Sequence, residues 1–113
     1  MSLGSDDSGV TELSLNNLIR IKNCGYVLTR ITLSIERVQF HFTKNPDLEA
    51  HYSASGISFG YGGEGAHGLW KAIRLWHPDK IGENFWDTEI PNLQRLKKYV
   101  WDLENGFQLL EDK

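Results

Sequence analysis

Residues 38–52 read VQFHFTKNPDLEAHY, with apolar side chains at alternate positions on both sides of a central Asn-Pro-Asp. Alternation with a period of two is typical of a strand with one buried face, and Asn-Pro-Asp is typical of a turn. An antiparallel register in which paired residue numbers sum to 92 satisfies every apolar position. The pairs are Phe40–Tyr52 and Phe42–Ala50 on the apolar face, and His41–His51 and Thr43–Glu49 on the polar face.

Further strands are expected on both sides of this hairpin. Residues 27–35 alternate, with Val27, Ile31 and Leu33 on one parity, and the parity switches after residue 37 as a turn or bulge would require. Residues 13–22 also alternate and are predicted to form one strand or two short ones, and residues 57–61 a further short strand. The result is an antiparallel sheet of four to five strands.

Helical spacing begins near Ala66 and continues to Trp76, and Pro78 ends this helix. A second helix is predicted from about Thr88 to Asn105. Gly106 would be its left-handed cap, Phe107 would fold back on Trp101, and residues 107–110 could add a terminal strand.

The fold prediction is therefore α+β, an antiparallel sheet with two α-helices packed on one face. Residues 10–113 are predicted to form a single domain. Residues 1–9 are small and polar, and are predicted to be a disordered tail.

Composition and charge exclude several classes of function. Twelve Lys and Arg against fifteen Asp and Glu give a net charge of −3, which argues against nucleic-acid binding because that needs a basic stripe. The single Cys24 cannot form an internal disulfide and fits a reducing compartment. Because there is no signal-peptide pattern in residues 1–9 and no apolar run of 18 residues, we expect a cytoplasmic protein without membrane contact.

Residues 59–69 read FGYGGEGAHGL and contain a G-x-G-x-x-G at Gly60, Gly62 and Gly65. Such a loop between a strand and a helix can cradle an anion with its N–H groups. A dinucleotide fold also needs a second parallel strand, and Glu64 would repel a pyrophosphate. We favour a structural role for these glycines, with a small anion-, phosphate- or nucleotide-binding module as the alternative.

The same segment resembles the F-x-W-G-Y-G-G-S-G-P-A-Q-L-A stretch of a family of small uncharacterised bacterial and phage proteins. Glu64 and Ala66 depart from the Ser and Pro of that family. The resemblance implies a strand that runs into a helix and a bacterial or mobile-element origin, and it implies no activity. The matching residues are Gly60, Tyr61, Gly62, Gly63, Gly65 and Leu69.

Enzymatic chemistry has little support in the sequence. His41, His51 and Glu49 could begin a metal site, but solvated residues on a sheet face are the favoured interpretation. The run from His77 to Lys80 resembles the His-Pro-Asp loop of J-domain co-chaperones, and a helix stopped by proline is favoured instead. No catalytic residue, metal site or cofactor is predicted.

Four tryptophans lie between Trp70 and Trp101, more than one small core needs. Since aromatic side chains dominate interface energetics, we predict a non-enzymatic binding or accessory protein that acts through a protein–protein interface. Its partner would be another protein or a second copy of the chain. The predicted site residues are Tyr61, Gly62, Gly63, Glu64, Gly65, His67 and Trp70.

Overall fold

A computed structural model describes residues 2–6, 11–34, 37–44, 47–54, 56–57, 64–78, 97–102 and 104–110. In these residues the elements follow the order β1 (Ser2–Asp6), α1 (Thr11–Asn23), β2 (Val27–Leu33), β3 (Val38–Lys44), β4 (Leu48–Ala54), α2 (Glu64–Trp76), β5 (Tyr99–Asp102) and β6 (Gly106–Leu109).

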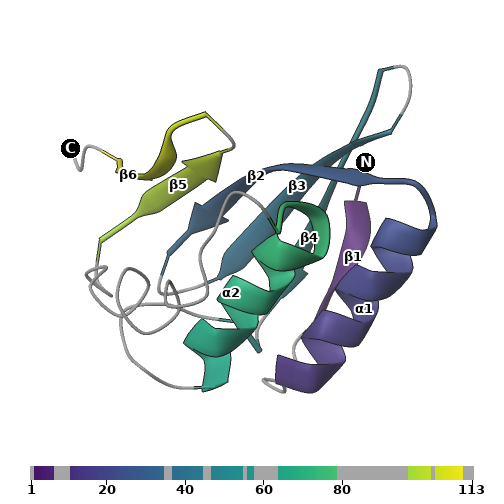
Figure 1. Cartoon of the computed structure of the whole chain (residues 1–113), viewed down its shortest axis with the longest axis horizontal. Coiled ribbons are helices and arrows are strands. Elements are labelled where there is room, and N and C mark those ends of the chain that lie inside the picture. The colour runs from purple at the N-terminus through teal and green to yellow at the C-terminus, as the bar shows by residue number, and fades with distance from the viewer. Residues whose placement is uncertain are drawn as a thin grey trace.

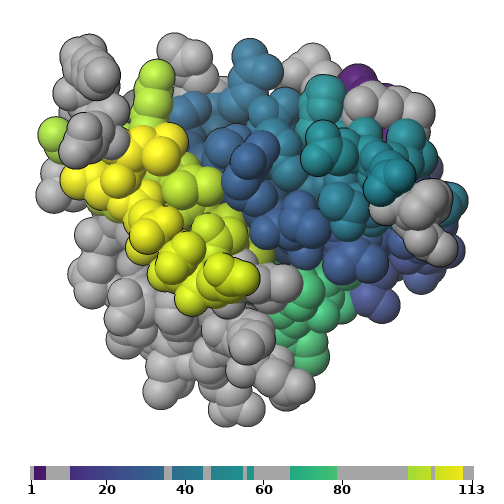
Figure 2. All heavy atoms as spheres, turned by 90° about the horizontal axis from the view of Figure 1, so that it is seen from above, coloured from purple at the N-terminus to yellow at the C-terminus, as the bar shows by residue number. Residues whose placement is uncertain are grey.

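The six described strands form one sheet in the order β1-β4-β3-β2-β5-β6. β1 runs parallel to β4, and the other neighbours are antiparallel. α1 and α2 lie side by side on one face of the sheet (Figure 1), and a view from above shows the green atoms of α2 along one side of the blue and teal atoms (Figure 2). The α+β prediction is confirmed, but the sheet is mixed and has more strands than predicted.

The β3–β4 hairpin has the predicted register. All four pairs, from Phe40–Tyr52 to Thr43–Glu49, occur as expected. Phe40 and Phe42 are fully buried under the helices, while His41 is partly exposed. The strict period of two on both strands makes any other register bury polar side chains, which explains why this part was predictable.

β2 is present as predicted, but one of its residues faces the other way. The pairing steps from Leu28–Phe42 to Arg30–His41, so Thr29 forms a bulge. The bulge shifts the parity, which buries Leu28 and leaves Val27 47% exposed. The expectation that Val27 shares the buried face of Ile31 is therefore wrong.

The strand predicted at residues 13–22 is wrong, because this segment forms helix α1. Its buried residues are Ser14 and Leu18, one helical turn apart, while Leu13 and Ile19 are 41% and 39% exposed. A helix whose buried stripe contains a serine lacks the apolar period of 3.6 that identifies amphipathic helices.

Polar contacts hold the buried face of α1. The Thr11 hydroxyl donates to the Gly56 carbonyl oxygen at 2.6 Å, and the Gly56 N–H donates to Ser14 Oγ at 3.2 Å. Asn17 Nδ2 donates to the Tyr52 hydroxyl at 3.0 Å. These bonds satisfy polar groups that burial would otherwise penalise, so a partly polar face can pack on the sheet.

The C-terminal helix is a further error of prediction where the structure describes it. Residues 99–102 form β5 and residues 106–109 form β6, and Trp101 pairs with Phe107 across the two strands. Gly106 has the expected left-handed backbone, with φ of 68°, but it follows a turn between strands rather than a helix. The predicted terminal strand is present, and the start of the predicted helix, residues 88–96, lies outside the described residues.

The N-terminal segment also differs from its prediction. Ser2–Asp6 forms β1, with Ser2 opposite His51 and Asp6 opposite Ala54, instead of a disordered tail. Leu3 packs against the core. Pairing with the edge of β4 gives this polar segment the backbone hydrogen bonds that composition alone does not indicate.

Helix α2 is confirmed and is the apolar partner of the sheet. Leu69, Ala72 and Ile73 are fully buried. At its C-terminal end, Trp76 Nε1 donates to the Tyr26 carbonyl oxygen at 2.8 Å, and the Trp76 ring packs 5.4 Å from that of Phe42. Of the strand predicted at residues 57–61, Ile57 is not in a strand and the rest lies outside the described residues.

We expect Phe40→Ala to lower the free energy of unfolding by about 3 to 5 kcal/mol, because the ring is fully buried and its removal leaves a cavity. Urea unfolding would measure this change. Thr43→Ala, an exposed position on the same strand, is the control and should change stability by less than about 0.5 kcal/mol. A loss below about 1 kcal/mol for Phe40→Ala would contradict the observed inward face.

Candidate functional site

The predicted site residues fall in two parts. Tyr61, Gly62 and Gly63 lie outside the described residues. Glu64 and Gly65 form the start of α2, and His67 and Trp70 follow on the same helix. The proposed use of this loop for anion binding therefore stays a prediction.

His67, Trp70 and Arg74 form a ladder along one side of α2. The rings of His67 and Trp70 stack with centroids 5.1 Å apart and planes 18° apart. The Arg74 guanidinium lies 5.2 Å from the Trp70 centroid, in cation–π geometry. Burial, then the positive charge of Lys71, lower the pKa of His67, which favours the neutral form of the stacked imidazole.

Trp70 also lines a groove between the two helices. The groove has a volume of about 280 Å³ and its walls are mainly apolar. Both charged side chains that line it are cations. The lining residues are Leu15 and Ile19 of α1, and Trp70, Lys71, Arg74 and Leu75 of α2.

The α1 wall of this groove differs from the sequence prediction. Leu15 and Ile19 were assigned to a strand, so they were never placed beside α2. The signal that could have placed them is the four-residue spacing of the two side chains, which puts both on one face of a helix.

Gly68 sets the distance between the helices. A Cβ at this position would lie 2.5 Å from Thr11 Cγ2 and 3.5 Å from Ile57 Cγ1. Thr11 cannot turn away without giving up the hydrogen bond between its hydroxyl and Gly56. The close approach of α1 and α2 therefore depends on glycine at position 68.

Gly68→Ala should destabilise the protein by about 1 kcal/mol or more, because the steric conflict outweighs the helical preference for alanine. Thermal or urea unfolding would measure this. Thr11→Ser removes the conflicting methyl group and keeps the hydroxyl, so the double variant should regain the stability of Thr11→Ser alone. A double variant as unstable as Gly68→Ala would refute the contact as the cause.

The other sequence candidates take different places. His77 Nε2 donates to the Leu28 carbonyl oxygen at 2.8 Å, so this residue joins α2 to β2, while Asp79 and Lys80 lie outside the described residues. Trp101 is only 3% exposed and Trp76 packs on the core, while Trp86 lies outside the described residues. Of the described tryptophans, Trp70 is the one that lines the groove.

His41 and His51 face each other on the polar side of the hairpin, with ring centroids 6.5 Å apart. Within the described residues there is no group of three or more side chains suited to hold a metal ion. Burial, then the charges of Arg30 and His51, lower the pKa of His41, and Glu49 opposes this. Folding therefore favours the neutral form of His41.

This shift has a consequence for acid stability. The unfolded chain has a His pKa near 6.5, so the stability contributed by neutral His41 is fully present above that pH and is lost as pH falls towards the lower folded pKa. We expect the denaturation midpoint to fall from pH 7.5 to pH 5, and to fall less in His41→Gln. His67→Gln serves as a comparison, since the pKa of His67 is lowered in the same direction. An identical acid response in His41→Gln and the parent chain would contradict this account.

Comparisons of the chain with protein-family models, curated proteins and solved structures found no match. The resemblance of residues 59–69 to the bacterial and phage family therefore stays a prediction. Neither α1 nor α2, the helices that the structure describes, has the length and apolar character needed to cross a membrane.

Proposed function

We propose that this protein is a non-enzymatic binding protein whose α1–α2 groove holds an acidic amphipathic helix of a partner protein. The observation that carries the proposal is the groove itself, in which apolar side chains from two helices are joined by the Trp70 ring and flanked by cations. A hydrophobic groove between helices is a common receptor for the apolar face of a third helix.

The charges of the groove favour a partner with carboxylates. Among the described residues that line it, the charged ones are Lys71 and Arg74, and α1 carries two further cations, Arg20 and Lys22, in its last turn. A carboxylate beside the apolar face of the partner would meet these cations at the rim, which favours the encounter and the correct orientation. The net charge of the chain is negative, so this basic surface stands out locally.

Trp70 is the natural anchor of the interface. It is partly buried and held by His67 on one side and Arg74 on the other, so little conformational entropy is lost when a partner covers it. The predicted site residues 61–63 directly precede α2 in sequence and stay predicted members of the interface. A cytoplasmic partner fits the single cysteine of the chain.

The test is selection of peptides from a displayed library of 16-residue sequences. Selected peptides should carry apolar residues at helical spacing together with Asp or Glu. Trp70→Ala should weaken their binding by about 30-fold or more, while the free energy of unfolding changes by no more than about 1 kcal/mol. Leu109→Ala, an exposed leucine on β6 that does not line the groove, is the matched control and should bind normally.

A charge-reversal pair separates this partner from others. The double variant Lys71→Glu, Arg74→Glu should bind acidic peptides more weakly than the parent chain does, and basic peptides more tightly. The proposal fails if selected peptides bind equally to the parent chain and Trp70→Ala. It also fails if sedimentation shows that the parent chain covers this groove by pairing with itself.

A further inference from the structure

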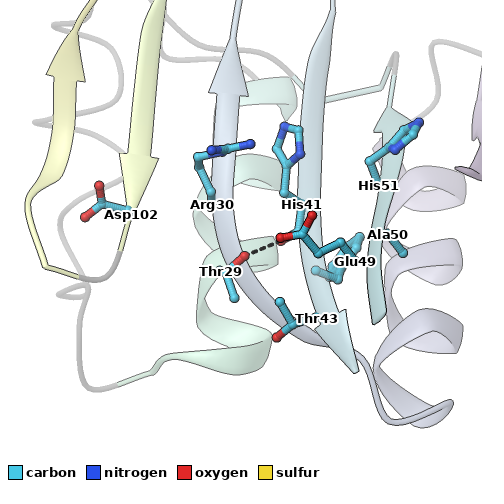
Figure 3. Close-up of a pocket in the computed structure, with 9 residues that line it drawn as sticks. Thr29, Arg30, His41, Thr43, Glu49, Ala50, His51 and Asp102 are labelled. Atoms are coloured by element: carbon cyan, nitrogen blue, oxygen red, sulfur yellow. Dashed lines mark hydrogen bonds between the residues drawn. The ribbon is translucent and has the colours of Figure 1, made fainter. Parts of the chain in front are cut away.

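The face of the sheet opposite the helices carries a row of side chains from four neighbouring strands. The backbone register pairs Asp102 with Arg30, Arg30 with His41, and His41 with His51. Figure 3 shows this row on the near side of the sheet, with the helices behind it. The four side chains line a depression of about 410 Å³, together with Thr29, Phe42, Thr43, Glu49 and Ala50.

Asp102 keeps its negative charge, and its carboxylate turns away from Arg30 towards the β5–β6 turn (Figure 3). Oδ1 accepts hydrogen bonds from the N–H groups of Asn105, at 2.7 Å, and Glu104, at 3.0 Å. Oδ2 accepts from Asn105 Nδ2 at 3.4 Å. These bonds, led by the one from the Asn105 N–H, lower the pKa of Asp102.

Arg30 is the fixed positive charge of the row. Among the residues that the structure describes, Arg30 forms no ion pair, and its guanidinium extends along the sheet towards the His41 ring (Figure 3). His41 is partly buried, with Nε2 3.4 Å from Thr32 Oγ1. Arg30, His41 and His51 thus bring one positive charge and two protonatable rings to one end of the depression.

Glu49 marks the other end. It lies opposite Thr43, two residues further along the hairpin than the His41–His51 pair and therefore on the same face of the sheet. Burial, then the charges of Arg30 and His51, lower the pKa of His41, and the negative charge of Glu49 raises it. Figure 3 shows the Glu49 carboxylate turned across β3 towards Thr29, so its negative charge lies on the Thr29 side of His41, while Arg30 and His51 flank the other side of the ring.

We propose that the Arg30–His41–His51 end of this depression binds the phosphoryl group of a small phosphate-bearing ligand. A guanidinium presents paired N–H donors that match two oxygens of a phosphate. Each imidazole donates a further hydrogen bond, and protonated imidazoles donate the strongest ones. The volume is within the range of sites that hold small molecules.

The alternative occupant is a divalent metal ion, since histidines and carboxylates are zinc ligands, but the described residues contain no group of three such side chains suited to one ion. The positive charge of Arg30 in the middle of the row opposes a cation and favours an anion. A phosphate also relieves the repulsion among Arg30, His41 and His51, so proton uptake by the rings and anion binding strengthen each other. The site lies on the face away from the α1–α2 groove and does not depend on the function proposed there.

The experiment is a titration with inorganic phosphate at constant ionic strength, followed by nuclear magnetic resonance of the Arg30 side chain and the two imidazole rings. We expect saturable shifts confined to this row. A parallel titration with sulfate, whose charge is constant between pH 6 and 8, should give tighter binding at pH 6. Shifts that do not saturate, or that spread evenly over the surface, would overturn the proposal.

Two variants are expected to change the affinity for phosphate in opposite directions. Arg30→Gln should weaken phosphate binding by about tenfold or more, and Glu49→Gln should strengthen it. Arg37→Gln, a surface arginine away from this depression, is the control and should leave it unchanged. The amide spectrum of each variant establishes that the fold is intact.

The same variants identify a metal site if there is one. A titration with zinc chloride would shift the resonances of both imidazole rings if the depression is a metal site. Zinc should then bind more weakly to Glu49→Gln and more strongly to Arg30→Gln than to the parent chain. That result would overturn the phosphate proposal in favour of a cation. Equal phosphate affinity in Arg30→Gln and the parent chain would also overturn the proposal, since the fixed charge would then have no role.

Discussion

The pairing of β3 with β4 is the constraint on which both surfaces of this protein depend. Its register sends Phe40 and Phe42 towards the helices and His41 and His51 to the opposite face. A slip of one residue would exchange the two sets, because strand side chains alternate with a period of two. The apolar face that packs against α1 and α2 and the polar row on the opposite face of the sheet therefore both follow from one set of backbone hydrogen bonds.

The parts of the fold that could be predicted are those in which local pattern and tertiary environment agree. The hairpin has strict alternation and a turn sequence, and α2 has an apolar stripe that faces the sheet. α1 was missed because Ser14 takes a buried position and Leu13 an exposed one, so its periodicity indicates a strand. β5 was missed because Val100 and Leu103 continue a helical spacing, whereas the burial of Tyr99 and Trp101 comes from neighbouring strands that the local sequence does not reveal.

The candidate sites show the same division. His67 and Trp70 were predicted from aromatic content and from their position after the glycine loop, and the His41–His51 pair from the hairpin register. Neither set is a site by itself. The groove needs Ile19 from α1, and the polar row needs Arg30 from β2, whose alignment with His41 depends on the bulge at Thr29. Contacts between elements distant in sequence complete both sites, and no local pattern encodes them.

The two surfaces are separated by the thickness of the sheet, so a partner in the α1–α2 groove leaves the polar row open. Both are built on regular elements, and rigid elements hold binding groups more precisely than loops do. Gly68 and the bonds to Gly56 fix the helices to each other and to the end of β4, while the β3–β4 pairs fix the histidines. Because the two surfaces share no lining residue, the proposed partner helix and the proposed anion would not compete for the same side chains.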